Sequence, residues 1–156
     1  MDNKSSQNAS LLTLERYLPY RLSILSNKVS YIVAESYKHK FSLSITEWRI
    51  MAVLGEYSGV SADEVSAKTQ IEKSLISRAI SKLLKRELIE RNISKEDKRR
   101  SELTLSKSGY DVYEKIVPMS LEYEEKLLSC LSESQQDDLS NIIDTLYSHA
   151  EKLEFK

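Results

Sequence analysis

The sequence predicts a mainly α-helical protein in which one two-stranded β-hairpin interrupts a series of helices. Glycine and proline, which break helices, number only 3 and 2 in 156 residues. Apolar residues recur at three- and four-residue steps over most of the chain, as they do on one face of an α-helix. One stretch alternates polar and apolar residues instead, which is typical of a strand. With 40% hydrophobic residues, the chain can form one core.

The first long helix is expected from Pro19 to about Lys40, after a short helical turn over residues 13–18. Proline suits the first turn of a helix, because its missing N–H has no partner there. The apolar face of this helix comprises Leu22, Leu25, Val29, Ile32 and Ser36, and Ile24, Tyr31 and Val33 widen it. A helix with so broad an apolar surface needs partners on more than one side.

A second helix is expected to begin with Thr46 as its N-cap and to end between residues 55 and 59. Ile45 would pack on Ile50 as a hydrophobic staple. Its core face would comprise Trp48, Met51 and Leu54.

A third, short helix begins after Ser61, because Ser61 and Glu64 have the spacing of a capping box. Val60 and Val65 form the matching staple, and the helix is expected to end near Lys68.

The fourth helix, from about Glu72 to Arg86, has one apolar and one cationic face. The apolar face comprises Leu75, Ile76, Ala79, Ile80, Leu83 and Leu84, which we expect to be buried. The opposite face comprises Ser74, Ser77, Arg78, Ser81, Lys82 and Lys85, which form one polar stripe with Lys73 at its start.

The hairpin follows directly. Residues 88–93 and 101–105 are predicted as its strands, joined by a charged turn over residues 94–100. The turn carries four cations, Lys95, Lys98, Arg99 and Arg100, beside Asp97.

Two C-terminal helices complete the chain. Ser106 is the expected N-cap of a helix from Lys107 to about Leu128, with Pro118 as the place for a kink. A capping box of Ser132 and Gln135 begins the last helix. Its apolar face comprises Leu139, Ile142, Ile143, Leu146 and Ala150.

Charge is distributed unevenly along the chain. Residues 68–100 contain eleven Lys/Arg and five Asp/Glu, a net charge of +6, whereas the remainder has a net charge of −7. The basic third coincides with the cationic helix and the hairpin turn. This asymmetry favours a surface that attracts a polyanion, although the net charge is only −1.

Several functional classes lack support. No run of 18 apolar residues indicates a membrane span, and the polar first ten residues lack the features of a signal peptide, so we expect a cytoplasmic protein. The single cysteine, Cys130, suits a reducing compartment. His39 and His149 lie far apart and form no metal-ligand spacing. No catalytic cluster or phosphate-binding glycine loop is present, so we expect neither an enzyme nor a cofactor.

The order of elements predicts a winged helix-turn-helix, with the hairpin as a two-stranded wing. An α-helix fits the major groove of DNA, and an arginine at the wing tip can enter the minor groove. We therefore expect double-stranded DNA as the partner. The candidate contacts are Lys73, Ser74, Ser77, Arg78, Ser81, Lys82 and Lys85 on the helix, and Lys95, Asp97, Lys98, Arg99 and Arg100 on the wing. Arg78 is the best candidate for a bidentate base contact.

Asp97-Lys98-Arg99 is followed at a fixed spacing by Leu105-Ser106 and Gly109. With this motif, residues 43–110 resemble the winged-helix core of MarR-type regulators, and residues 71–78 resemble the opening of that family's recognition helix. The resemblance implies a homodimer with intertwined terminal helices, and often an inducer bound where the first helix meets the lobe. It also implies that Asp97 and Arg99 hold the wing and meet the minor groove.

The resemblance also implies a division of the chain and one departure. Residues 1–40 would be an N-terminal tail and dimerisation helix, 41–105 the DNA-binding lobe and 106–156 the C-terminal dimerisation helices. Glu87 stands where the family usually has glycine, which accepts a left-handed conformation cheaply. We therefore expect a different turn before the wing.

Alternatives remain at this stage. The cationic stripe could be a solvated face, and a winged helix could bind only proteins. Candidate ligand-binding residues for an aromatic acid or its thioester are Tyr17, Arg21, Tyr31, Trp48, Arg49 and Tyr113. Trp48 and the tyrosines could instead be core and interface residues, and Arg49 a surface ion pair. Cys130 is expected to be an inert packing residue rather than an oxidant sensor.

Overall fold

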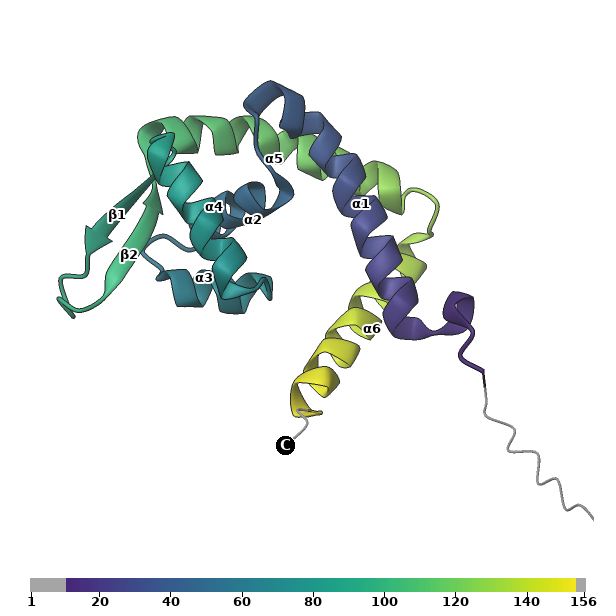
Figure 1. Ribbon diagram of the computed structural model, residues 1–156. Helices are drawn as coiled ribbons and strands as arrows, with labels where there is room; N and C mark the ends of the chain where they lie inside the picture. Colours follow the sequence, from purple (N-terminus) through teal and green to yellow (C-terminus); the bar gives the residue numbers. More distant parts are fainter. Residues whose placement is uncertain (1–10, 154–156) are drawn as a thin grey trace, which may run out of the picture.

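A computed structural model describes residues 11–153 and contains six α-helices and one β-hairpin in the predicted order (Figure 1). The polar segment 1–10 lies outside the described residues. The elements are η1 (Leu14–Arg16), α1 (Leu18–Phe41), α2 (Ile45–Glu56), α3 (Ala62–Thr69), α4 (Lys73–Lys85), β1 (Ile89–Ile93), β2 (Ser101–Leu105), α5 (Lys107–Leu128) and α6 (Glu133–Lys152). The predicted fold class, a mainly helical winged helix-turn-helix, is confirmed.

The core lies where α2, α3 and α4 pack together beneath the hairpin. The apolar face of α4 supplies Ile76, Ile80 and Leu83, each at most 1% exposed. They meet Ile50 and Met51 of α2, which are fully buried. Tyr37 of α1 and Ile116 of α5 also belong to this core, so both long helices are anchored to the lobe formed by α2, α3, α4 and the hairpin.

The wing is held at its base by more than its own ladder. Strands β1 and β2 are antiparallel, with Ile89 opposite Leu105 and Ile93 opposite Ser101. Leu103 also exchanges two backbone hydrogen bonds with the segment before α3: its N–H donates to Val60 O at 2.8 Å, and Gly59 N–H donates to Leu103 O at 3.1 Å. These bonds join the wing to the segment that precedes α3.

Gly109 explains why the first turn of α5 can lie directly against the start of the wing. A Cβ at this position would stand 1.8 Å from the carbonyl oxygen of Leu88. Ser106, the N-cap of α5, donates its N–H to the same oxygen at 3.1 Å and accepts from Gly109 N–H at 3.0 Å. Only a residue without a side chain permits this approach.

The turn before the wing corrects one expectation. Glu87 adopts the left-handed conformation, with φ +57°, so the turn has the geometry that glycine would favour, although the residue differs. Its carbonyl oxygen accepts from the hydroxyls of Ser106, at 2.6 Å, and Ser108, at 2.9 Å. These bonds help to hold a conformation that is costly for a residue with a side chain.

Two local predictions at α2 are wrong. The helix begins at Ile45 with Ser44 as N-cap, because Ser44 and Glu47 form a capping box, so Thr46 lies inside the first turn. Ile45 is therefore helical and is not a staple residue that precedes the cap. The capping boxes predicted at Ser61 and Ser132 are present.

The outer halves of the long helices leave the lobe and expose apolar side chains. Figure 1 shows α6 and the N-terminal half of α1 extending away from the lobe, while α5 crosses above it. Leu22 and Leu25 on α1 are 51% and 59% exposed, and Ile142 and Ile143 on α6 are 56% and 55% exposed. The apolar faces predicted for these helices thus have few partners within the described chain. Helix α5 continues through Pro118.

Among residues 11–153, none of the helices combines the length and the apolar character that crossing a membrane requires.

Candidate nucleic-acid interface

The outer face of α4 is an exposed cationic surface. All seven predicted contact residues of this helix are exposed: Lys73, Ser74, Ser77, Arg78, Ser81, Lys82 and Lys85. Within the described part of the chain, Arg78, Lys82 and Lys85 have no acidic partner in an ion pair, whereas Lys73 pairs with Asp63 at 2.9 Å. The first three can therefore meet an anion without first breaking a bond.

Two of the serines on this face are already hydrogen-bonded. Ser74 Oγ donates to Glu72 Oε1 at 2.7 Å, and Ser81 Oγ donates to the carbonyl oxygen of Ser77 at 3.0 Å. Because serine side chains are small, they project little from the surface of the helix. This shape suits close approach to the floor of a groove.

Hydrogen bonds around Asp97 shape the wing tip. Arg99 N–H donates to Asp97 Oδ1 at 3.0 Å, and Arg100 N–H donates to the Asp97 carbonyl at 2.9 Å. The buried Ser94 accepts from the N–H groups of Glu96 and Asp97, both at 3.3 Å. The turn thus presents the side chains of Lys98 and Arg99 outward on a closed loop. Sequence reasoning identified Asp97 but missed Ser94.

Arg100 differs from the other cations of the wing because it is paired within the chain. Its guanidinium donates to Glu64 Oε2, in the capping box of α3. Ser61 N–H, which donates to the same oxygen at 2.7 Å, and Arg100 lower the pKa of the Glu64 carboxyl from 4.5 to about 2. The pair ties the wing tip to the start of α3 and so positions the neighbouring Arg99.

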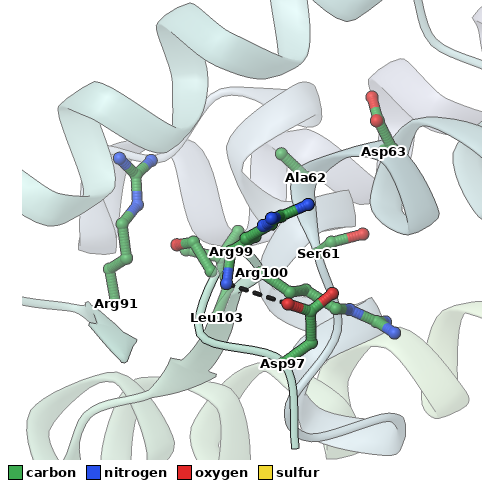
Figure 2. A pocket seen from close by; sticks show the side chains of 9 residues that line it. Ser61, Ala62, Asp63, Arg91, Asp97, Arg99, Arg100 and Leu103 are labelled. Carbon is green, nitrogen blue, oxygen red and sulfur yellow. Dashed lines mark hydrogen bonds between the residues drawn. The ribbon is translucent and has the colours of Figure 1, made fainter. Parts of the chain in front are cut away.

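A recess of about 520 Å³ lies between the wing and the start of α3. Figure 2 shows Arg91, Arg99 and Asp97 around it, together with Ser61 and Asp63. Arg91 projects from β1 and was not among the predicted contacts. Arg91 lies opposite the buried Leu103 across the hairpin, so both are on the face of the hairpin that lines the recess, together with Arg99.

A third residue that sequence reasoning missed connects α4 to α1. Arg86, the C-cap of α4, donates to the carbonyl oxygens of Phe41 at 2.7 Å and Ser42 at 2.8 Å. Ser42 ends α1 in a left-handed conformation, with φ +51°. A guanidinium at this place satisfies carbonyls that the helix leaves free and couples the position of α4 to the end of α1.

The six predicted ligand-binding residues do not meet in one pocket. Tyr17 and Arg21 lie near the exposed start of α1. Trp48 packs against Tyr113, with ring centroids 5.9 Å apart and the ring planes tilted by 31°. Tyr31 lines a different recess, described below.

Arg49 is the remaining residue of the predicted ligand set. Arg49 Nη2 donates to Ser30 Oγ at 3.0 Å. Tyr37, which was not predicted, also packs against Trp48, with ring centroids 5.7 Å apart and the ring planes tilted by 41°, and burial raises its pKa to about 12. Trp48 therefore lies within an aromatic cluster that joins α1, α2 and α5.

Cys130 is exposed at the end of α5, so the expectation of a packed cysteine is wrong for this chain. His39 lies on the surface of α1, 3.5 Å from Glu35, and His149 is exposed on α6.

We expect Glu64→Gln to loosen the wing tip, because it removes the charge that holds Arg100. Hydrogen exchange followed by mass spectrometry should show amides of residues 94–101 exchanging about two- to fivefold faster, as for loss of an exposed pair. Since the pKa of Glu64 is lowered, the stabilisation is present above about pH 4.5 and is lost as the pH falls toward 2.

Asp63→Asn is the matched control for this substitution. It removes one carboxylate from the same helix end, but Asp63 pairs with Lys73 and not with the wing. Equal exchange at residues 94–101 in Glu64→Gln and in the unmodified protein would show that the pair does not hold the wing.

Comparisons with known proteins agree with this geometry. A model of the MarR family matches residues 41–100, which extend from the end of α1 to the wing tip. The HTH-type transcriptional regulator BilQ of Clostridium symbiosum is 28% identical over 115 residues, which cover 74% of this chain and 80% of BilQ.

Solved structures share the fold over nearly the whole chain. A MarR/EmrR family transcriptional regulator from Acinetobacter sp. ADP1 superposes with a TM-score of 0.84 and 29% identity, covering 91% of this chain and 100% of that chain. MepR of S. aureus, solved as a complex with DNA, has a TM-score of 0.76 at 20% identity and covers 85% of this chain and 98% of its own.

Proposed function

Because the chain belongs to the MarR family of DNA-binding transcriptional regulators, we propose that it is a homodimeric repressor that a small-molecule effector releases from DNA. The DNA site would be a pseudo-palindromic operator, and the repressor would work in the cytoplasm. The observation that carries this proposal is the exposed cationic face of α4 beside a wing whose tip presents Arg99.

Each lobe offers two contacts of different kinds to a duplex. Helix α4 would enter the major groove, where Arg78 can donate two hydrogen bonds to a guanine. Lys82 and Lys85 would meet phosphates, which position the protein without reading the sequence. Arg99 would enter the adjacent minor groove from the wing. Arg100, already paired with Glu64, would position the wing rather than contact DNA.

The proposed dimer is supported by the apolar surface of the outer helices. Many exposed large apolar side chains on neighbouring turns of a helix mark an interaction site. The surface comprises Leu14, Tyr17, Leu18, Leu22 and Leu25 from η1 and α1, with Leu139, Ile142, Ile143, Leu146 and Tyr147 from α6. In a two-fold dimer the two lobes would read half-sites about one helical turn apart. Residues 1–40 and 106–156 would then be the dimerisation segments.

A recess at the junction of α1 and α2 is the proposed effector site. It has a volume of about 320 Å³ and is lined by Tyr31, Ala34, Leu43 and Lys38, among others. The lining also includes one carboxylate, Glu35, and the hydroxyls of Ser44 and Thr46. Lys38 is the group that would attract an aromatic acid or its thioester, and the apolar side chains would surround its ring. Leu43 directly follows the carbonyls that Arg86 binds, so a ligand that displaces this segment would shift α4 and change the spacing of the lobes.

The alternative is a winged helix that binds proteins and not DNA. Release of counterions from DNA distinguishes the two, because each neutralised phosphate steepens the dependence of affinity on salt. A fluorescence anisotropy titration with an operator selected from random DNA should show affinity falling roughly a thousandfold between about 50 and 200 mM salt, as for six phosphate contacts per dimer. Selection of no DNA, or binding that salt leaves unchanged, would favour the alternative.

The same titration tests the effector. A panel of aromatic acids and their coenzyme A thioesters should contain at least one compound that releases the operator. Tyr31→Ala should lose this response and keep DNA binding, whereas Tyr57→Ala, which removes an exposed tyrosine at the end of α2, outside both the recess and the dimer surface, should keep both. If no compound in the panel weakened operator binding, the aromatic effector would be wrong, while the DNA-binding function would stand.

A further inference from the structure

We propose that Leu75 reads the C5-methyl group of a thymine in each half-site of the operator. This inference rests on the DNA-binding function proposed above and adds a specificity-determining residue to it. The helical pattern predicted that Leu75 would be buried with the other apolar residues of α4. The structure corrects this: Leu75 is 47% exposed, whereas Ile76, Ala79 and Ile80 are at most 6% exposed.

The position of Leu75 around the axis of α4 determines toward which surface its side chain is exposed. Successive residues of an α-helix are about 100° apart, so Leu75 lies about 60° from Arg78 around the axis. Arg78 and Lys82 follow it at i+3 and i+7, which places all three along one side of the helix. Leu75 therefore borders the cationic face and is directed toward the same partner as Arg78.

The depth of Leu75 along α4 also fits this role. The helix begins at Lys73, so Leu75 lies in its first turn. In helix-turn-helix proteins the N-terminal residues of the recognition helix contact the base edges, whereas later residues approach the backbone. Leu75 would thus lie over the bases and not over the phosphates.

The chemistry of the major groove selects one target for such a side chain. Leucine has no hydrogen-bonding group, and among the four bases only thymine carries an apolar group on its major-groove edge. A leucine beside the methyl group removes apolar surface of both from water. The other bases offer donors and acceptors there, which leucine would leave without partners.

Substitution of thymine by uracil tests this contact, because it removes the methyl group and keeps base pairing. The operator that the protein selects from random DNA is synthesised with deoxyuridine at one thymine at a time, and affinity is measured by anisotropy. At one thymine per half-site, the full-length protein should bind about fourfold more weakly, as for one buried methylene-sized group. The Leu75→Ala variant should bind equally well with thymine or uracil at that position. At every other thymine, uracil should change its affinity as much as it changes that of the unmodified protein.

Two control variants separate this contact from general effects. Leu75→Met keeps a large apolar side chain and should retain part of the sensitivity to uracil. Ile93→Ala removes a different exposed apolar side chain, 71% exposed on β1, and should retain all of it. Thermal unfolding of Leu75→Ala should match that of the unmodified protein, since an exposed side chain contributes little to the core.

Each outcome bears on one claim. The inference is overturned if no uracil substitution weakens binding, or if Leu75→Ala keeps the same sensitivity at every position. Failure to select any DNA would instead overturn the proposed function.

Discussion

A Gly109→Ala variant is expected to lose about 3 kcal/mol or more of its free energy of unfolding, at the upper end of what overpacking costs. The added Cβ would stand 1.8 Å from Leu88 O and 2.8 Å from the carbonyl carbon, both of which are backbone atoms. Because both atoms belong to the backbone, neither can be moved by rotating a side chain. Relief requires α5 to move away from the wing, which breaks the bond from Ser106 N–H to Leu88 O.

Urea denaturation followed by circular dichroism measures this loss. Ser108→Ala is the matched control, because it alters the neighbouring residue in the same turn and removes only the hydroxyl that donates to Glu87 O. Its cost should be about 1 kcal/mol. Equal midpoints for Gly109→Ala and the unmodified protein would show that α5 does not approach Leu88 as closely as described. Should Gly109→Ala not accumulate in folded form, its failure beside a folded Ser108→Ala is itself the expected result.

The second large effect is expected from Arg78→Ala, which should cost about 1–3 kcal/mol of operator affinity per half-site and relax the preference for one base pair. Arg78 is exposed at the centre of the α4 face and lacks an acidic partner among the described residues. Arg99→Ala should instead weaken binding to operator and to random DNA by similar factors, since a wing arginine responds to groove width and phosphate charge. Binding-site selection with each variant measures both effects.

Lys115→Ala is the control for these arginines. It removes one positive charge from an exposed position on α5, away from α4 and the wing, and should leave operator affinity unchanged. A uniform loss across all sequences for Arg78→Ala would reassign this residue to phosphate contact. Unchanged affinity for both arginine variants would remove α4 and the wing as the DNA-binding surface.

Local interactions made most of the elements predictable. A capping box joins residues three positions apart, so Ser61 and Ser132 mark helix starts whatever surrounds them. Alternation of polar and apolar residues placed β2 at residues 101–105, as observed. At α2 the prediction chose Thr46 as the cap, although Ser44 and Glu47 have the same three-residue spacing as the other capping boxes, so this signal was present in the sequence and was missed.

Burial and partner choice were less predictable, because they depend on residues distant in sequence. Periodicity grouped Leu75 with the buried residues of α4, but nothing among residues 11–153 covers it fully, and it is 47% exposed. Arg100 was indistinguishable from Arg99 by type and position in the turn, yet only Arg100 reaches Glu64, 36 residues earlier. Arg86 likewise finds its carbonyl partners 44 and 45 residues away.

The amino-acid sequence alone determined the order of the elements, the basic third of the chain and the family motif around Asp97 and Gly109, because these depend on residue types and short spacings. Tertiary structure decided which cations are free to meet DNA, which one holds the wing, and why position 109 excludes a side chain. The physical reason is that ion pairs and steric limits arise between atoms that folding brings together, and their partners are not encoded by spacing along the chain.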